Sequence, residues 1–407
     1  MTMSVTDAAR RREVHFRPEP EPRPVQNLLI SVDDHIIEPP TMFDGRISSK
    51  FGDRAPRIVE QDGVQVWSLN EEIWLNIGLN AIVWRVPEEW NMEPANFDEM
   101  RPGCWQIDAR IADMDIAGVY ASVNFPSMLA GFAGARFSEI DDAELGLACT
   151  RAWNQWHIEE WAAPYPDRII PLQIPWLRDA EIAAAEVRRN AELGFKALSF
   201  PENPAVLGFE PLFGDFWDPL WAACEETETV ICIHAGSAGG LLARDDSTPP
   251  DVGPPLMGCY ALIATTFWLY SGAVTKFPKL KIALSEGGLG WVPMLLDRLE
   301  YMERHSAQAA EFHAWNDPTL SPSEALLRNF TFCTFDDPSM IRIRDRIGVD
   351  NITVEVDYPH ADSTWPKSLD VARENFGHLA ADVTYKLIRG NGRRLLRMEP
   401  DPIAIDN

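Results

Sequence analysis

Five residues with side chains that commonly bind metal ions follow short apolar runs in this 407-residue sequence: Asp33, His35, His234, Glu286 and Asp357. Taken singly, each has an ordinary structural explanation. A lone histidine is often a hydrogen-bonded core residue, Glu286 could cap a helix that begins near Trp291, and Asp357 could hold a turn. Burying several ionisable groups together is costly unless a cation compensates their charge, so the set as a whole predicts a divalent metal site.

The positions of these residues depend on the elements that precede them. Short β-branched and apolar runs alternate with helix-like segments, which is typical of parallel β/α units. The eight predicted strands are 28–32, 119–125, 169–174, 195–200, 230–233, 280–284, 330–334 and 352–356. A doubly wound open sheet would also alternate in this way, but the count of eight favours a (β/α)₈ TIM barrel. In such a barrel the carboxyl ends of all strands meet at one face, where the five residues would converge.

Several segments fall outside the predicted β/α repeat. About seventy residues separate the first strand from the next helix, too many for a simple loop, and we expect a β-hairpin in them at 64–69 and 73–77. We predict a mobile or subunit-contacting N-terminal arm (1–26), a barrel domain (27–400) and a tail (401–407). Within the barrel domain we expect an insertion at about 40–107 that caps its mouth, a lid within 237–259 and a C-terminal helical extension after Lys367.

Composition excludes several classes of partner. Acidic residues outnumber basic ones by 62 to 36, giving a net charge of -26, which disfavours binding to nucleic acid or to anionic lipid. The longest apolar stretch, 261–274, is too short to cross a membrane. The six cysteines show no C-x-x-C spacing, which indicates free thiols and a cytoplasmic location. Fifteen tryptophans and the proline-rich arm favour a homo- or hetero-oligomer.

Five sequence motifs carry a resemblance to a known family. They are Ser31-Val32-Asp33-Asp34-His35-Ile36-Ile37-Glu38-Pro39, Ala112-Asp113-Met114-Asp115-Ile116-Ala117-Gly118-Val119, Ile233-His234-Ala235-Gly236, Ser285-Glu286-Gly287-Gly288 with Trp291 and Pro293, and Asp357-Tyr358-Pro359-His360-Ala361-Asp362-Ser363. With these motifs the chain resembles the amidohydrolase superfamily, in the branch of 2-amino-3-carboxymuconate-semialdehyde decarboxylase. The resemblance extends from about Ser31 to Leu396 and also implies a TIM barrel.

The resemblance implies roles for individual residues. In that family the first strand supplies a pair of metal ligands, the fifth a histidine and the eighth an aspartate; these roles fall on Asp33 and His35, His234, and Asp357. The sixth strand of the family supplies a histidine, and here the sequence departs, because the position holds Glu286. Two further residues, Glu38 and His360, become candidate ligands, although both lie in proline-containing turns where a structural role is equally expected. His360 could bind a second metal or orient Asp357.

A carboxylate-rich ligand set suits manganese or iron at least as well as zinc, so we expect one or two divalent ions. The resemblance then implies a metal-dependent hydrolase or decarboxylase that acts on a small, carboxylate-bearing molecule, with Asp357, Glu286 and His360 as catalytic candidates. Two alternatives stay open: a dinuclear iron or manganese monooxygenase, and an inactive metal-binding partner subunit. Four further histidines lie away from the strand ends and are predicted to be surface or helix-face residues: His157, His305, His313 and His378.

Overall fold

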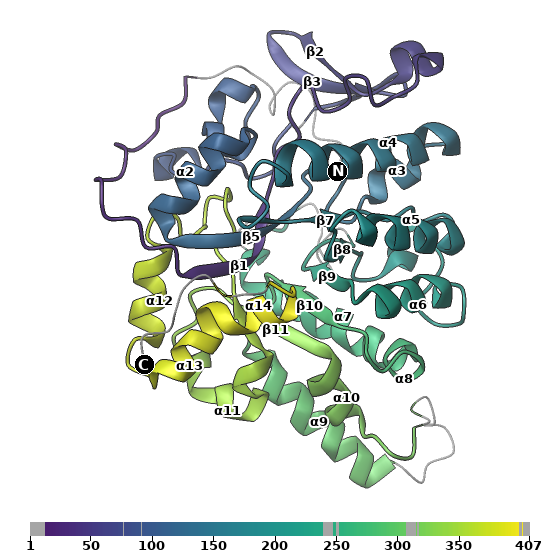
Figure 1. Cartoon of the computed structure of the whole chain (residues 1–407), viewed down its shortest axis with the longest axis vertical. Helices are drawn as coiled ribbons and strands as arrows, with labels where there is room; N and C mark the ends of the chain where they lie inside the picture. The colour runs from purple at the N-terminus through teal and green to yellow at the C-terminus, as the bar shows by residue number, and fades with distance from the viewer. Residues whose placement is uncertain are drawn as a thin grey trace.

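A nine-stranded parallel sheet forms the centre of the molecule (Figure 1). The structure, a computed structural model, describes residues 13–75, 77–90, 92–238, 247–249, 252–306, 315, 317–398 and 401. The strands of this sheet are β1 (Leu29–His35), β5 (Val119–Phe125), β6 (Ile169–Ile170), β7 (Leu172–Gln173), β8 (Ala197–Ser199), β9 (Val230–His234), β10 (Ile282–Ser285), β11 (Phe330–Thr334) and β12 (Ile352–Val354). Each falls within or overlaps one of the eight predicted strands.

The sheet closes on itself at Pro171. Its strand order is β6-β5-β1-β12-β11-β10-β9-β8-β7, so β6 and β7 lie at opposite ends of the order although one residue separates them in sequence. Pro171 has no N–H to donate to the ladder, and its carbonyl accepts hydrogen bonds from the backbone N–H groups of Lys196 and Ala197. One predicted strand, 169–174, therefore pairs with β5 through its first half and with β8 through its second. Counted as one, the two halves make an eight-stranded barrel.

Helices surround the barrel (Figure 1). They are α2 (Ile107–Ala117), α3 (Ala135–Glu139), α4 (Ala143–Trp156), α5 (Ala180–Glu192), α6 (Asp218–Thr227), α7 (Met257–Tyr270), α8 (Ala273–Lys276), α9 (Trp291–Ser306), α10 (Pro322–Asn329), α11 (Arg344–Ile347), α12 (Ser368–Phe376), α13 (Ala381–Tyr385) and α14 (Asn391–Leu395). Several begin at side chains that accept hydrogen bonds from the first turn: Asp142 caps α4, Asp179 caps α5, and Ser321 forms a capping box with Glu324 at α10. These caps fix where helices start and so fix the loops that precede them.

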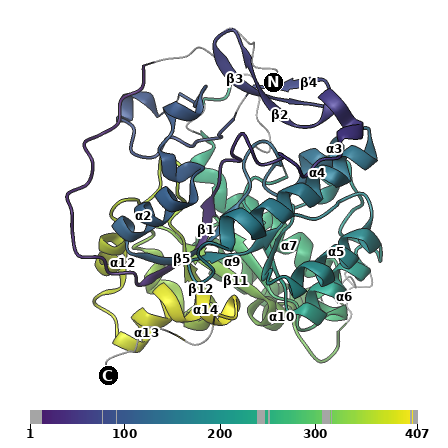
Figure 2. The ribbon, with the colours of Figure 1, turned by 45° about the horizontal axis from the view of Figure 1, so that its top comes forward.

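A second, antiparallel sheet lies apart from the barrel, between β1 and α2 in sequence (Figure 2). It consists of β2 (Arg57–Gln61), β3 (Val64–Leu69) and β4 (Glu72–Trp74). Sequence patterns predicted two strands here, and β2 was missed because Arg57, Glu60 and Gln61 obscure its alternation. The sheet has a small core of its own, in which Val64 and Val66 pack with Ala95.

The ends of the described chain pack against the barrel domain. Residues 13–26 run as an extended segment whose His15 and Glu19 pair with Glu89 and Arg101, respectively. The predicted lid at 237–259 includes residues 239–246, 250 and 251, and the predicted tail includes 402–407; all of these lie outside the described residues. None of the helices among the described residues has both the length and the apolar composition needed to cross a bilayer.

Candidate metal centre

Strand β1 presents Asp33 and His35 on one face, because alternate residues of a strand point the same way. All seven residues of β1 are buried. Asp34 points to the other face, where its carboxylate accepts hydrogen bonds from Ser31 Oγ and the backbone N–H of Tyr358. The backbone of β1 is joined to the segment after β12 by two hydrogen bonds: Asp357 donates to Asp33 O at 2.9 Å, and His35 donates to Tyr358 O at 2.6 Å. The predicted first-strand and eighth-strand residues are thus neighbours.

His234 ends β9 and faces His35. Its Nδ1 lies 2.7 Å from the carbonyl oxygen of Ala235, which accepts a hydrogen bond when Nδ1 carries the proton. That tautomer leaves the Nε2 lone pair free, and Nε2 lies 3.1 Å from Nε2 of His35. Burial lowers the pKa of His234 to about 3 and also lowers that of His35, so both rings are neutral, the form in which imidazole binds a metal ion.

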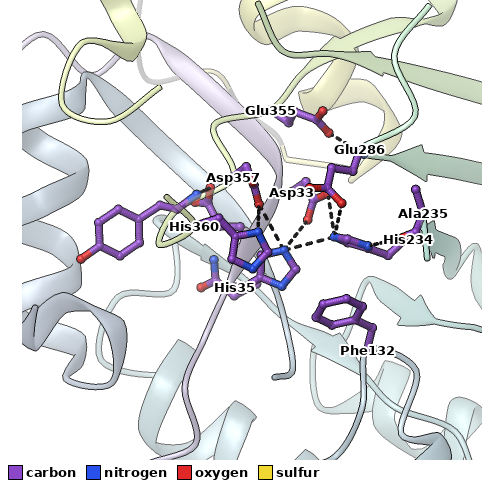
Figure 3. A network of polar contacts seen from close by, with 12 residues as sticks. Asp33, His35, Phe132, His234, Ala235, Glu286, Glu355, Asp357 and His360 are labelled. Atoms are coloured by element: carbon purple, nitrogen blue, oxygen red, sulfur yellow. Dashed lines mark hydrogen bonds and ion pairs between the residues drawn. The ribbon is translucent and has the colours of Figure 1, made fainter. Parts of the chain in front are cut away.

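Carboxylate oxygens surround the two Nε2 atoms (Figure 3). Asp33 lies 3.6 Å from Nε2 of His35 through Oδ1 and 3.4 Å from Nε2 of His234 through Oδ2. Asp357 Oδ1 lies 3.3 Å from Nε2 of His35. Two ligand atoms bound to one ion at about 2.1 Å lie about 3.0 to 3.4 Å apart, depending on the angle between them. The observed spacings are close to this range, so Asp33, His35 and His234 converge on one ion-sized position, and Asp357 lies beside it in a group with His35 and His360.

The carboxylates of this cluster lack the partners that buried carboxylates need. Neither oxygen of Asp33, which is 0% exposed, accepts a hydrogen bond from a described residue. Burial raises the pKa of Asp33, as do the nearby carboxylates of Glu355, Asp357 and Glu286. Burial also raises the pKa of Asp357. A divalent cation would supply the missing positive charge and the missing contacts, so these residues fit a metal ion.

Glu286 directs a further carboxylate toward the cluster. Its Oε2 lies 3.7 Å from Nε2 of His234, and with Asp357 and Asp362 it offers three oxygen atoms within 4.8 Å of one another. Both Glu286 and Asp357 have positive φ angles, 58° and 62°, which few residues other than glycine adopt. Strained backbone at two residues after strand ends is common at functional sites, where the surrounding structure holds it in place.

Glu355 supports Glu286 and was missed by sequence reasoning. It accepts a hydrogen bond from the backbone N–H of Glu286 at 2.9 Å and another from the thiol of Cys333. Burial raises the pKa of Glu355 to about 8. The available signal is a charged residue inside the apolar run 352–356, which the predicted strand includes. Glu202 was also missed; it follows the predicted strand 195–200, and burial raises its pKa to about 7.

His360 lies against the cluster as predicted from sequence. Its ring stacks on His35 with centroids 4.0 Å apart, and its Nδ1 lies 2.8 Å from Asp357 Oδ1. Burial lowers the pKa of His360, but the carboxylate of Asp357 outweighs this effect, so the net direction is upward. The geometry places His360 where it can either bind an ion together with His35 and Asp357 or orient the Asp357 carboxylate.

Glu38 does not join these residues. Its Oε1 accepts hydrogen bonds from Ser127 N and Trp153 Nε1, each at 3.1 Å, and its Oε2 accepts one from Ser127 Oγ. Among the described residues it belongs to none of the potential ligand groups. The prediction that Glu38 binds metal is therefore corrected: the chain leaves the extended conformation after His35, so the two-residue alternation no longer places its side chain at the site.

His157 lies in a helix, which agrees with the helix-face alternative of its prediction, and it is fully buried. Its ring stacks on Trp153, and its Nε2 accepts a hydrogen bond from the backbone N–H of Leu172 at 3.3 Å. The chain widens into a π-helical turn after α4, in which His157 is directed at the core. His305 and His378 are exposed, and His313 lies outside the described residues.

A cavity of about 820 Å³ opens beside Glu286 and Asp357. Its wall combines carboxylates with apolar side chains, among them Met257, Leu262, Trp291, Met294 and Phe335. Phe132 covers the histidines, with its ring centroid 4.4 Å from that of His234 (Figure 3). The volume is within the range of small-molecule sites, and the mixed wall suits a molecule with an apolar body and a metal-binding group.

Comparison with known proteins shows the family to which the chain belongs. A family model described as amidohydrolase matches residues 52–398. Among solved structures, an amidohydrolase from Mycobacterium avium subsp. paratuberculosis K-10 has a TM-score of 0.69 at 22% identity, covering 92% of this chain and 100% of its own. The 5-carboxyvanillate decarboxylase of Sphingomonas paucimobilis has a TM-score of 0.60 at 21% identity, covering 91% of this chain and 99% of its own.

A third structure is a dihydroxybenzoic acid decarboxylase from Polaromonas sp. JS666 with bound manganese and the inhibitor 2-nitroresorcinol. It has a TM-score of 0.62 at 18% identity and covers 92% of this chain and 98% of its own. At these identities the solved structures establish a shared fold. The family model, which matches most of the chain, establishes the family: this chain belongs to the amidohydrolase family.

Proposed function

We propose that the protein is a metal-dependent carboxy-lyase that removes CO₂ from a small, carboxylate-bearing aromatic molecule, with hydrolysis as the related alternative. The observation that carries this proposal is the convergence of Asp33, His35 and His234 on one ion-sized position, with Asp357 beside it and both oxygens of the buried Asp33 without a hydrogen bond from the described residues. Two supporting facts are the apolar cavity beside them and the similarity in fold to decarboxylases of aromatic acids.

The ion would be held by Asp33, His35, His234 and Asp357, and manganese suits their mixed nitrogen and oxygen donors. When bound, it would supply a positive charge that holds and polarises a substrate carboxylate. Met257, Leu262 and Trp291 would bind the aromatic body, and Phe132 would keep water away from the histidines.

Loss of CO₂ from an aromatic ring requires a proton for the ring carbon that loses it. Glu286 lies between the metal ligands and the cavity, with 22% of its side chain exposed, so its carboxyl group can both reach a substrate and hold a proton. His360 is the second candidate for this step, since it lies against Asp357 and His35. For hydrolysis the same two residues would take a proton from the attacking water.

A specific observation favours one further candidate function, a dinuclear monooxygenase. Glu286, Asp357 and Asp362 form a group of oxygen donors that shares Asp357 with the group of His35, Asp357 and His360, which is how two ions can be bridged by a carboxylate. Iron or manganese in both positions would suit O₂ chemistry. The inactive partner subunit predicted as a third option has no observation of this kind in its favour.

Metal content tests the proposal first. The purified wild type should carry about one divalent ion per chain, and His234→Ala and Asp357→Ala should lose it, measured by elemental analysis after gel filtration. His305→Ala, which removes an exposed histidine, is the matched control and should keep the ion. Full occupancy in both site variants would refute the ligand assignment, and a metal-free wild type would favour the inactive subunit.

Activity assays then separate the chemistries. Manganese-loaded protein should release CO₂ from a hydroxybenzoate such as 2,6-dihydroxybenzoate or 5-carboxyvanillate, the substrates named for proteins of similar fold. O₂ consumption with two iron or manganese ions per chain would replace the decarboxylase proposal with the monooxygenase. An active wild type whose Asp357→Ala variant keeps full activity would contradict both.

We further propose that the segment at about 40–107 is an insertion that caps the barrel mouth. The helices after Lys367 would form a C-terminal extension. The protein would be a cytoplasmic oligomer. Free cysteines support the location, since all six lack disulfide partners and five are buried. Exposed apolar side chains on α7 and α9, including Ile263, Phe267 and Met294, support a subunit interface. Gel filtration with light scattering tests the oligomer.

A further inference from the structure

The cavity beside the metal centre has a wall in which every charged side chain is acidic. Its described lining residues include no lysine, arginine or histidine but five carboxylates: Glu286, Asp337, Glu355, Asp357 and Asp362. In the part of the chain that the structure describes, these carboxylates form ion pairs with histidines of the metal centre only. The wall therefore disfavours a substrate whose only charge is negative.

A bound metal ion would compensate only part of this acidic charge. A divalent ion carries two positive charges, and the carboxylates of Asp33 and Asp357 beside it balance them. The charges of Glu286, Asp337 and Asp362 are then left over. Carboxylate oxygens of Glu286 and Asp362 lie within 4.8 Å of each other, a spacing that one ammonium group with its three N–H donors can bridge.

Glu355 provides an independent observation (Figure 3). It is 4% exposed and lines the cavity, and both hydrogen bonds that it accepts, from Glu286 N and Cys333 Sγ, go to Oε2. Its Oε1 has no donor among the described residues and keeps some exposed surface, unlike the enclosed oxygens of Asp33. Burial raises the pKa of Glu355 to about 8, but a carboxyl group accepts hydrogen bonds in either protonation state. A buried acceptor in the cavity wall needs a donor from the ligand.

Aromatic side chains complete this part of the wall. Trp291 and Phe335 line the cavity together with Met257 and Met294. The indole Nε1 of Trp291 donates to Gly287 O at 2.8 Å, which fixes the ring in place. The face of an aromatic ring attracts an organic cation, and such rings combined with carboxylates are typical of sites for alkylammonium groups.

We propose that the substrate is a zwitterion, an aromatic acid that also carries a protonated aliphatic amine, and that its ammonium group lies in the acidic part of the cavity. This inference rests on the proposed function, in which the metal ion holds the carboxylate of the substrate. The ammonium group donates to carboxylate oxygens of the wall, among them those of Asp362 and Glu355 Oε1. An amine bound directly to the ring is uncharged at neutral pH and gains less from this wall. The cavity, at about 820 Å³, is large enough for such a molecule.

Isothermal titration of the full-length, manganese-loaded protein tests the site with the meta and para isomers of aminomethylbenzoate. The matching ethylbenzoates have the same shape without the positive charge. At least one aminomethyl isomer should bind about tenfold or more tightly than its ethyl counterpart, because charge-assisted hydrogen bonds form.

Asp337→Asn/Asp362→Asn removes two negative charges from the wall and should reduce this preference about threefold or more. Asp336→Asn is the matched control, because Asp336 is exposed and lies outside the wall. Its amide oxygen can still accept the hydrogen bond from Asn375, so the variant should fold and keep the full preference.

Three results would overturn the inference. They are equal or tighter binding of the ethyl compounds, no binding of either kind, and a preference that Asp337→Asn/Asp362→Asn leaves unchanged. Elemental analysis adds a fourth: a wild type with two ions per chain that loses one in this double variant would show that the carboxylates bind a second ion instead.

Release of CO₂ separates this inference from the proposed function. Release from 2,6-dihydroxybenzoate, combined with no preference for the amines, overturns the zwitterionic substrate and leaves the carboxy-lyase standing. A preference for the amines without release of CO₂ from any hydroxybenzoate, including aminomethyl-substituted ones, supports the ammonium site and refutes the carboxy-lyase.

Discussion

The carboxylate of Asp33 lies fully buried between two imidazole rings and accepts no hydrogen bond from the described residues. An isolated charge in such a place would cost several kcal/mol. The neighbouring carboxylates make the cost larger, since each raises the pKa of Asp33. A cation bound at this position would compensate the buried carboxylate charge. The residues around the position differ in whether they would bind that cation or act beside it.

A substitution at Glu286 separates metal binding from proton transfer. Glu286→Gln keeps the size of the side chain but removes its capacity to transfer a proton. We expect the variant to retain the ion held by Asp33, His35, His234 and Asp357, while turnover falls by about two orders of magnitude or more, the usual contribution of a positioned acid or base. Elemental analysis and kcat on the best substrate measure the two effects. Glu210→Gln, on the exposed surface, is the control; unchanged turnover in Glu286→Gln would assign proton transfer to another residue.

His157 carries a prediction about stability. Burial lowers its pKa to about 3, whereas in the unfolded chain the value is near 6.5. Between these values the unfolded state binds a proton that the folded state does not, so stability falls as the pH falls from about 6.5 toward 3. This single group contributes a slope of about 1.4 kcal/mol per pH unit in that window.

His157→Gln removes the titration. Urea unfolding at pH 6, 5 and 4 should show a shallower loss of stability than in the wild type, although the variant starts from a lower stability because ring stacking on Trp153 is lost. His378→Gln, an exposed histidine, should follow the wild-type pH dependence. Identical slopes for the wild type and His157→Gln would mean that His157 is protonated in the folded state.

At the scale of elements, the segment after β12 determines the geometry of the site. Tyr358 follows Asp357 and is held on three sides: its carbonyl accepts from His35 N, its N–H donates to Asp34, and its hydroxyl donates to Asp113 Oδ2 on α2. The guanidinium group of Arg110 lies 4.4 Å from the centre of its ring and also donates to His35 O. These contacts fix Asp357 relative to His35 from behind the site.

Tyr358→Phe should therefore weaken metal binding. The variant loses the hydroxyl contact with Asp113 while keeping the ring, and removal of such supporting hydrogen bonds weakens metal affinity about 10- to 100-fold. Competition with a chelating dye measures the affinity. Tyr385→Phe is matched in chemistry, because the Tyr385 hydroxyl also donates to a carboxylate, that of Asp401, at 2.9 Å. Equal metal affinities for the two variants would exclude a positioning role for Tyr358.

At the scale of the whole molecule, the barrel and most of the site followed from sequence because both depend on strand ends. Asp33, His35, His234, Glu286 and Asp357 each come directly after an apolar run, and parallel strands in a barrel bring such positions together. Their convergence required no knowledge of loop structure. The same reasoning gave β6 and β7 as one strand, and only the break at Pro171 escaped it.

The positions that the sequence did not predict depend on irregular backbone. The direction of Glu38 is set by the loop after His35, and that of His157 by a π-helical turn, and neither follows a two-residue or a 3.6-residue period. Glu355 was missed because the predicted strand 352–356 includes it, whereas β12 ends at Val354. The packing of residues 13–26 was also beyond sequence patterns, because an extended segment gains its order entirely from the partners it meets.

Arg23 gives that segment its firmest attachment and the last prediction. Its guanidinium group donates to Ile116 O, to Pro366 O and to the carboxylate of Asp370, so it joins the chain start to α2 and to the segment before α12. Arg23→Ala should lower the free energy of unfolding by about 1–2 kcal/mol, a modest value because the group is partly exposed. Arg57→Ala removes an exposed ion pair with Asp53 and should change it by less than about 0.5 kcal/mol. Urea unfolding compares the two, and equal effects would show that the N-terminal segment contributes nothing to the stability of the barrel.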